Sequence, residues 1–535
     1  MTPRILGALL GGVALSLAFA PVGAEWVIPF AVAAFFLACH GLPARRAWLP
    51  GLVFGVGFCF VHMFWMRVVG WDAWALLSGL EASFYGLLGA VVGRVGRLRA
   101  WPVYGAAGWV AVEVLRGGWP FSGMPWGRLS YATADTPWER ALPYVGQSGV
   151  SLALAMLGAA LAWAVLVARR SGVTGVGGGL VPAGTLAVVA LPGLLPALAP
   201  YDVTLTGEER TVAVVQGDVP GNGDDILLDH RQVTRNHVEA TTELADRVAS
   251  GEAPAPDFVL WPENSTAVDP FADGDINASI DAAASAIGVP ILVGAMVDAG
   301  SEHVLNQGIV WDPQTGGGDR YTKHNPVPFG EYIPWRSVFR DNFGRLALIP
   351  RDMVKGTRVE PLQVAGTAVG DAICFDVAYD AGIHDQLRAG AELLVVQTSN
   401  AMFIHTAQIE QQYEITRLRA IETGRYVLVA ATNGVSGVIA PDGSVVAEAD
   451  PRTRAVLVEQ VGLSDELTPA VRIGPWLGRL CAALVGVALL ATLFPYVRRR
   501  AVGGTAENAV GTAAGGDPVS PARTPAETRM ETRTR

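Results

Sequence analysis

Long apolar runs fill most of the first 200 residues of the chain, and one more such run lies near its end. Each run approaches the roughly 20 residues that a helix needs to cross a bilayer. This pattern predicts a polytopic α-helical membrane bundle of eight spans, seven before residue 200 and one after residue 470. The runs lie at about 5–21, 24–41, 48–66, 73–93, 100–116, 149–168, 178–198 and 475–497.

A different pattern fills residues 201–470, where short β-branched runs alternate with helical segments. Alternation of this kind predicts an α/β domain whose sheets are largely covered by helices. We expect strands at 211–216, 257–261, 290–295, 308–311, 368–374, 393–397, 426–431, 434–439 and 444–448, and helices at 229–249, 275–287 and 406–425.

Composition divides the chain further. Only 16% of the residues are charged, where a soluble protein has about a quarter. The net charge of −10 comes mainly from residues 201–470, so this domain faces water. No basic stripe suggests nucleic-acid binding. We expect a membrane domain at 1–200, an extracytoplasmic domain at 201–470, a final span within 471–500 and a disordered cytoplasmic tail at 501–535.

The arginines between the apolar runs set the direction of the spans. Connections rich in arginine stay in the cytoplasm, and here these are the connections with Arg45, Arg46, Arg94, Arg97, Arg99, Arg169, Arg170 and Arg498–Arg500. The domain at 201–470 is then outside, in a multi-pass protein of the cell membrane. Residues 1–20 either form a retained first helix, which we favour, or a cleaved signal peptide.

Two further features concern the membrane domain. Glu113 and Arg116 are spaced to pair on one helix, and with Glu81 they are either functional or a structural device for helix packing. The segment 117–147 is rich in aromatic residues, which suit the lipid–water interface. It either guides a lipid substrate or only anchors the protein.

Candidate chemistry lies at three strand ends of the polar domain. Cys374 is the only cysteine of that domain, because Cys39, Cys59 and Cys481 fall in apolar runs. Glu263 follows the strand that ends in Trp261, and Lys323 lies in the segment Tyr321-Thr322-Lys323-His324. In α/β domains, ligands bind where strands end.

A glutamate, a lysine and a cysteine can together perform acyl transfer. The carboxylate accepts the thiol proton as a general base, and the ammonium group favours the thiolate and stabilises the oxyanion. Each residue alone also has an ordinary interpretation. Glu263 can be a surface helix cap, Lys323 a solvated side chain and Cys374 a buried inert thiol, while Glu331 and Asp376 can be structural ion-pair partners.

The motifs around these residues resemble the carbon–nitrogen hydrolase (nitrilase) superfamily, and more closely its membrane branch, the apolipoprotein N-acyltransferase family. They are WPEN at 261–264, YTKHNPVPFGEYIP at 321–334 and DAICFD at 371–376, supported by 123–132, 398–400 and 417–425. The resemblance covers roughly residues 1–498. Two departures are Asp376, where many members have glutamate, and the stretch 401–404.

The resemblance implies a nitrilase αββα sandwich on an eight-helix bundle. It implies that Glu263 is the general base, Lys323 the oxyanion-stabilising residue and Cys374 the nucleophile, with Glu331 and Asp376 supporting the site. The implied ping-pong reaction moves an acyl chain from a phospholipid to the N-terminal amine of a diacylated apolipoprotein, without metal or organic cofactor. Two alternatives stay open: a membrane-tethered amidase, and a non-catalytic lipoprotein-binding scaffold.

Overall fold

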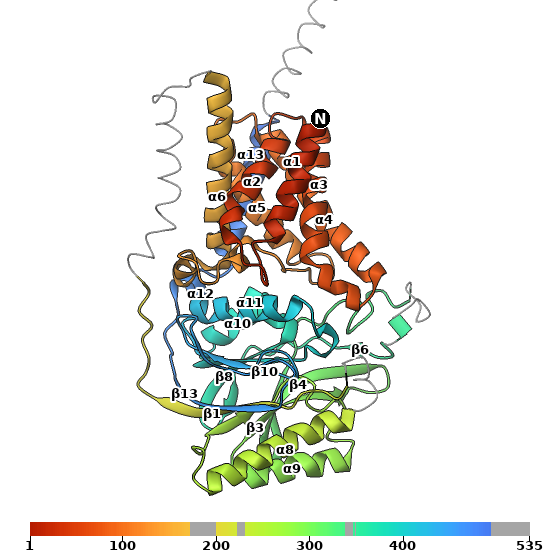
Figure 1. The fold of residues 1–535 in the computed structure, drawn as a ribbon, viewed down its shortest axis with the longest axis vertical. Helices are drawn as coiled ribbons and strands as arrows, with labels where there is room; N and C mark the ends of the chain where they lie inside the picture. Colours follow the sequence, from red (N-terminus) through yellow and green to blue (C-terminus); the bar gives the residue numbers. More distant parts are fainter. Residues whose placement is uncertain (172–199, 222–229, 338–345, 348, 494–535) are drawn as a thin grey trace, which may run out of the picture. The chain divides into compact units, whose positions relative to one another are not determined.

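A computed structural model describes residues 1–171, 200–221, 230–337, 346, 347 and 349–493. The predicted span at 178–198 and the predicted disordered tail at 501–535 lie outside these residues. The other predicted apolar runs are helical, and their helices are shown in Figure 1: α1 (Thr2–Ser16), α2 (Ile28–Cys39), α3 (Ala44–His62), α4 (Trp71–Val95), α5 (Trp101–Arg116), α6 (Leu142–Ser171) and α13 (Trp476–Ala491).

Length separates these helices into two groups. Within the described residues, three segments are long and apolar enough to cross a membrane: Ala44–His62, Trp71–Val95 and Glu139–Arg169. The segments Thr2–Ser16, Glu25–Cys39 and Trp476–Ala491 are apolar but shorter. Helix α1, for example, ends at Ser16, and turns follow as far as Pro21 and Val22. The predicted bundle of eight spans is therefore not confirmed.

The pairing predicted between Glu113 and Arg116 is wrong. Arg116 instead forms an ion pair with Glu81 of α4, at 2.8 Å, and both side chains are buried. Glu113 accepts hydrogen bonds from the Trp109 indole and from the Leu129 backbone N–H. Helix spacing alone suggested the pair, but α4 packs beside α5 and offers Arg116 a carboxylate on a neighbouring helix.

Two sheets form the centre of the polar domain. The first has the order β13 (Ala455–Gly462), β1 (Glu209–Gln216), β2 (Phe258–Leu260), β3 (Ile291–Asp298), β4 (His303–Asp312) and β5 (Gly316–Thr322), with β6 (Asp352–Met353) beside β4. The second has the order β12 (Val445–Glu448), β11 (Gly437–Ile439), β10 (Val427–Ala431), β9 (Leu393–Thr398), β8 (Thr367–Ile373) and β7 (Leu362–Val364).

Helices cover the outer face of each sheet. Helices α8 (His230–Ala249) and α9 (Gly274–Ile287) lie on the first sheet, and α10 (Asp380–Arg388) and α11 (Gln408–Thr423) on the second (Figure 1). The inner faces pack against each other through fully buried side chains such as Val214, Leu260, Val369, Val395 and Leu428. The domain is therefore the expected αββα sandwich.

The sequence pattern leaves some elements unpredicted. Strand β5 contains three consecutive glycines, which rarely mark a strand, and β7 has only three residues. Strand β13 and helix α10 were also not predicted. The elements that position the candidate site were predicted, apart from β5. They are β2 of the first sheet and the parallel neighbours β8 and β9 of the second. The ends of β2 and β9 meet where the Ser399 backbone N–H donates to the Glu263 carboxylate.

Candidate active site

The three candidate side chains come together at the strand ends. Lys323 follows β5, and its Nζ lies 3.1 Å from Glu263 Oε1 and 2.6 Å from Glu331 Oε1. Cys374 follows β8 and lies within the electrostatic influence of all three groups. Lys323 is fully buried and Glu263 is 3% exposed. This burial excludes a solvated lysine and a surface helix cap.

The backbone at two of these strand ends takes an unusual conformation. Cys374 has a φ of 52°, and Asn264, which follows Glu263, has a φ of 54°. A non-glycine residue in this left-handed region costs about 1–3 kcal/mol, and such residues cluster at functional sites. At Cys374 the chain passes from β8 into the 3₁₀ turn Cys374–Ala378, which presents the thiol at the end of the strand.

Three donors fix the orientation of the Glu263 carboxylate. Oε1 accepts hydrogen bonds from Lys323 Nζ and, at 2.7 Å, from Asn306 Nδ2, while Oε2 accepts one at 2.8 Å from the Ser399 backbone N–H. Charge-assisted hydrogen bonds of this kind are strong and directional. The carboxylate is therefore held in place beside the lysine.

Asp376 holds the segment of Lys323 against the turn of Cys374. Its carboxylate accepts hydrogen bonds from the Tyr321 hydroxyl at 3.2 Å, from the His324 N–H at 3.1 Å and from the Asn325 N–H at 2.7 Å. The Asn325 side chain donates another at 2.9 Å. Asp376 is thus engaged with the chain around Lys323, which is a positioning role and not an ion pair.

Burial raises the pKa of the Cys374 thiol to about 12. The negative charge of Glu263 contributes to this rise, while Lys323 and a hydrogen bond from Thr398 act against it. Gln412 of α11 donates to the Thr398 hydroxyl at 2.9 Å, which leaves that hydroxyl free to donate to sulfur. Lys323 therefore favours the thiolate, as expected, but does not produce it: the resting group is a thiol.

The lysine stays charged. Burial lowers the pKa of Lys323, but Glu263 and Glu331 raise it more, so the pKa lies well above its ordinary value. Burial and Glu263 also raise the pKa of Glu331, against the effect of Lys323. The Glu331 carboxylate also accepts a hydrogen bond from the Val327 N–H at 2.8 Å. One cation is thus shared between two carboxyl groups, which disfavours a third negative charge on sulfur.

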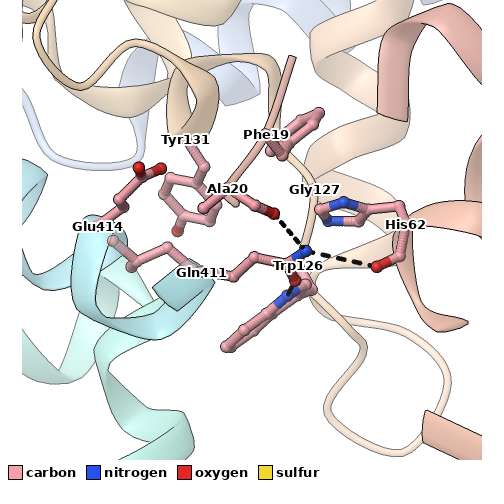
Figure 2. Close-up of a pocket in the computed structure, with 9 residues that line it drawn as sticks. Phe19, Ala20, His62, Trp126, Gly127, Tyr131, Gln411 and Glu414 are labelled. Carbon is pink, nitrogen blue, oxygen red and sulfur yellow. Dashed lines mark hydrogen bonds between the residues drawn. The ribbon is translucent and has the colours of Figure 1, made fainter. Parts of the chain in front are cut away.

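Gln411 of α11 ties this site to the apolar helices. Its Oε1 accepts hydrogen bonds from the indoles of Trp65 and Trp126, at 3.1 and 2.8 Å. Figure 2 shows the Trp126 contact and the hydrogen bond that Nε2 donates to the Ala20 carbonyl. The Trp126 ring stacks at 6.1 Å on Phe375, the neighbour of the nucleophile candidate. The cavity between these residues is only about 10 Å³, the size of about one water, so it cannot hold an acyl chain.

A buried ion-pair network makes a second connection. Arg128, in the aromatic segment, binds both carboxylate oxygens of Asp380 at 2.8 and 2.9 Å. Arg419 of α11 binds Asp380 at 2.8 Å and donates to the Val377 carbonyl in the turn that follows Cys374. The aromatic segment at 117–147 is therefore joined to the nucleophile turn. Among the described residues, no group of three or more His, Cys, Asp or Glu side chains could hold a metal ion.

The chain matches known proteins along most of its length. Residues 11–160 match the apolipoprotein N-acyltransferase N-terminal domain, and residues 211–466 match carbon-nitrogen hydrolase. An apolipoprotein N-acyltransferase from Mycolicibacterium smegmatis is 36% identical, over 90% of this chain and 84% of the relative. The chain belongs to the apolipoprotein N-acyltransferase family. A member from Methylococcus capsulatus is 31% identical, over 93% of this chain and 96% of the relative.

Solved structures related to this family member are more distant. An amidase of the nitrilase superfamily from Nesterenkonia AN1 is 16% identical, covers 50% of this chain and 95% of its own, and gives a TM-score of 0.37. A carbon-nitrogen hydrolase from Helicobacter pylori G27 is 16% identical, and the match covers 51% of this chain and 93% of the hydrolase, with a TM-score of 0.35.

Two site residues of this family member, Asn306 and Gln412, escape sequence reasoning, and a third, Thr398, falls in the motif at 398–400 without its role following from it. Each is buried and polar. The available signal is a polar side chain within an apolar strand, as with Asn306 in β4 and Thr398 at the end of β9. Buried polar groups need partners, but the identity of the partner comes only from the packing.

Proposed function

We propose that this chain is an apolipoprotein N-acyltransferase. It moves an acyl chain from a phospholipid, through a thioester on Cys374, to the N-terminal amine of a diacylglyceryl-cysteine. The observation that carries the proposal is the convergence of Glu263, Lys323 and Cys374 at buried strand ends. It occurs in a chain related along 90% of its length to a protein named for this activity.

The first half of the reaction forms the thioester. Cys374 Sγ attacks the ester carbonyl while Glu263 accepts the thiol proton, because the resting thiol has too high a pKa to ionise alone. Lys323 stabilises the oxyanion. The tetrahedral intermediate collapses, the lysophospholipid alkoxide leaves, and it takes the proton from Glu263.

The second half uses the amine of the acceptor. The amine nitrogen attacks the thioester carbonyl, Glu263 accepts a proton from that nitrogen, and Lys323 again stabilises the oxyanion. The amide forms as the C–S bond breaks, and the leaving sulfur recovers the proton from Glu263. Lysine, glutamate and cysteine then return to their starting states.

An aromatic surface beside the site supports a lipid donor. Phe121 packs against Phe329 at 5.6 Å and against Trp335 at 4.9 Å, and Tyr332 donates a hydrogen bond to the Phe121 carbonyl. Trp335 is 65% exposed. These residues flank Glu331, so an apolar surface lies next to the catalytic group. Contact with such a surface removes the apolar surface of an acyl chain from water and so stabilises its binding. A small polar amide has little apolar surface to bury.

The proposed topology has eight spans, with the domain at 201–470 outside and the last span within 471–500. The positive-inside arrangement of the arginines supports it. The test is labelling by a membrane-impermeant maleimide in intact cells. Ser301→Cys, in an exposed loop of the domain, should be labelled, and Arg97→Cys only after the membrane is opened. The reverse result would refute this direction.

The activity is tested with a fluorescent phospholipid and a diacylated lipopeptide. We expect the purified protein to transfer the acyl chain to the peptide, and Cys374→Ala to abolish transfer, because the nucleophile is lost. Cys481→Ala, which removes a buried thiol on α13, is the matched control and should keep activity. Turnover of small amides without peptide acylation would favour the amidase, and an inactive wild type would favour the scaffold.

A further inference from the structure

Asp371 is a fully buried acid that the proposed reaction does not use. It lies on β8, three residues before Cys374, and is 0% exposed. Its neighbours two positions away on the strand, Val369 and Ile373, belong to the apolar layer between the two sheets. Side chains two apart point to the same face of a strand, so the Asp371 carboxyl group enters that layer as well.

Gln397 on β9 faces the same layer. Its Nε2 donates a hydrogen bond to the Trp261 carbonyl at 2.6 Å and reaches the Leu292 carbonyl at 3.4 Å. These contacts fix the orientation of the amide, so Oε1 is its free atom. Neither Gln397 Oε1 nor either carboxyl oxygen of Asp371 has a hydrogen-bond partner within the described part of the chain.

Gly308 on β4 shows that these oxygens approach the same point. A Cβ added to Gly308 would lie 2.2 Å from Asp371 Oδ2 and 2.6 Å from Gln397 Oε1. The two oxygens therefore converge over bare backbone, in a space too small for a methyl group. A carboxylate and an amide oxygen are both acceptors only. The contact is stable only if a proton lies between them, and only a protonated Asp371 can supply it.

The charges around Asp371 agree with a neutral acid. Burial raises the pKa of Asp371 well above its ordinary value, and the negative charges of Asp376 and Glu263 raise it further, against a weaker effect of the Ala372 backbone N–H. Tyr321 of β5 also faces it, as a neutral phenol whose pKa is itself raised by burial. No cation among the described residues contributes to the pKa of Asp371.

We propose that Asp371 is a protonated carboxylic acid that donates a hydrogen bond to Gln397 Oε1. Through the Trp261 carbonyl, this contact fixes the end of β2, which carries Glu263, relative to the end of β8, which carries Cys374. Asp371 is thus a positioning residue, a role that rests on the proposed function of those two residues. Its protonated state does not rest on that function.

The first test measures stability against pH in detergent. A raised pKa means that the folded protein keeps a proton that the unfolded chain releases, so this group loses stabilising effect as pH rises above the ordinary aspartate range. Asp371→Asn is isosteric and does not titrate. We therefore compare the melting temperature of the variant with that of the wild type at each pH. We expect the difference, variant minus wild type, to be larger at about pH 9 than at about pH 5 by about 2 °C or more. Asp385→Asn, at an exposed site on α10, controls for the loss of a surface carboxylate.

The second test observes the proton directly. Infrared spectra of the wild type at neutral pH should contain a protonated-carboxyl C=O band that is missing in Asp371→Asn and present in Asp385→Asn. A melting difference that does not change with pH, together with no such band, would overturn the proposal. Neither measurement needs acyl transfer, so failure here is separate from failure of the proposed function.

Activity then tests the positioning role. Asp371→Asn can still donate to Gln397 Oε1, and we expect it to keep at least half of the transfer rate. Asp371→Leu has similar size but no donor, and we expect at least a tenfold loss. Equal rates for the two variants would refute the positioning role. If Asp371→Leu does not fold, the transfer rate of Asp371→Asn decides alone. A large loss of that rate would refute the positioning role, because the asparagine can still donate the hydrogen bond.

Discussion

At the scale of single residues, the site combines a protonated thiol with a fixed carboxylate. Cys374 is half-buried, and desolvation beside Glu263 raises its pKa to about 12. Such a thiol reacts only when a base removes its proton during attack. In the proposed reaction, Glu263 therefore has two opposing effects. Its charge makes the free thiolate rarer, and its basicity makes the attack possible.

These two effects can be separated with Glu263→Gln. Loss of the negative charge lowers the pKa of Cys374, so we expect iodoacetamide to alkylate this residue faster than in wild type at pH 8. Loss of the base should lower acyl transfer by about 10²–10⁴-fold. The measurements are peptide mass spectrometry of Cys374 alkylation and the lipopeptide assay. A variant in which both rates fall, or both rise, would argue against this double role.

Sequence alone could predict the main residues of the site, but not their surroundings. Glu263 and Cys374 each follow an apolar strand, and Lys323 lies in the motif at 321–334; both signals are visible in the sequence. Asn306 looks ordinary there. Thr398 and Asp371 fall within the family motifs, but their contacts do not follow from the motifs, because these contacts depend on a partner across a sheet or on another strand. The orientation of the Gln397 amide, for instance, follows from a carbonyl 136 positions away.

At the scale of elements, the turn after Cys374 is held from two sides. Asp376 fixes it to the segment of Lys323, and the pair of Arg128 and Asp380 fixes the following residues to the aromatic segment. Burial raises the pKa of Asp380, but Arg128 and Arg419 lower it more, well below its usual range. Its stabilising effect is therefore present at neutral pH and is lost as pH falls below the ordinary aspartate range.

Arg128→Met tests this connection because it keeps the length of the side chain and removes its charge. Asp380 is partly exposed and keeps Arg419, so we expect a modest loss of about 1–3 kcal/mol at pH 7, seen as a lower melting temperature, and a smaller loss at about pH 2.5, below the ordinary aspartate range. Transfer should also slow. Arg454→Met, which breaks exposed pairs with Glu239 and Glu243, should change stability by less than about 0.5 kcal/mol. Similar losses in both variants would contradict a special role for Arg128.

The elements also show where sequence patterns fail. Alternation of strands and helices predicted the strands that carry the site, because these are buried and rich in β-branched residues. Strand β5 was not predicted, since its glycines have low strand propensity and it is set by antiparallel pairing with β4. Helix spacing suggested that Arg116 pairs with Glu113, yet the neighbouring helix α4 supplies Glu81.

At the scale of the whole molecule, the described helices and the αββα domain act as one unit. Gln411 of helix α11 contacts the end of α3 at the His62 carbonyl and the aromatic segment at Trp126. Arg419 of the same helix donates to Tyr131 of the aromatic segment, and Gln412 reaches Thr398 in the site. Division into an apolar part and a polar part followed from composition. The contacts between the two parts could not be predicted from composition, because these contacts join residues up to 391 positions apart.

The most direct test of the central claim is mass spectrometry of the intact protein after incubation with phospholipid alone. The account predicts an adduct of one acyl chain, located on the peptide of Cys374, sensitive to hydroxylamine and released when the diacylated lipopeptide is added. An adduct on another residue, or full transfer activity with no adduct at Cys374, would contradict it.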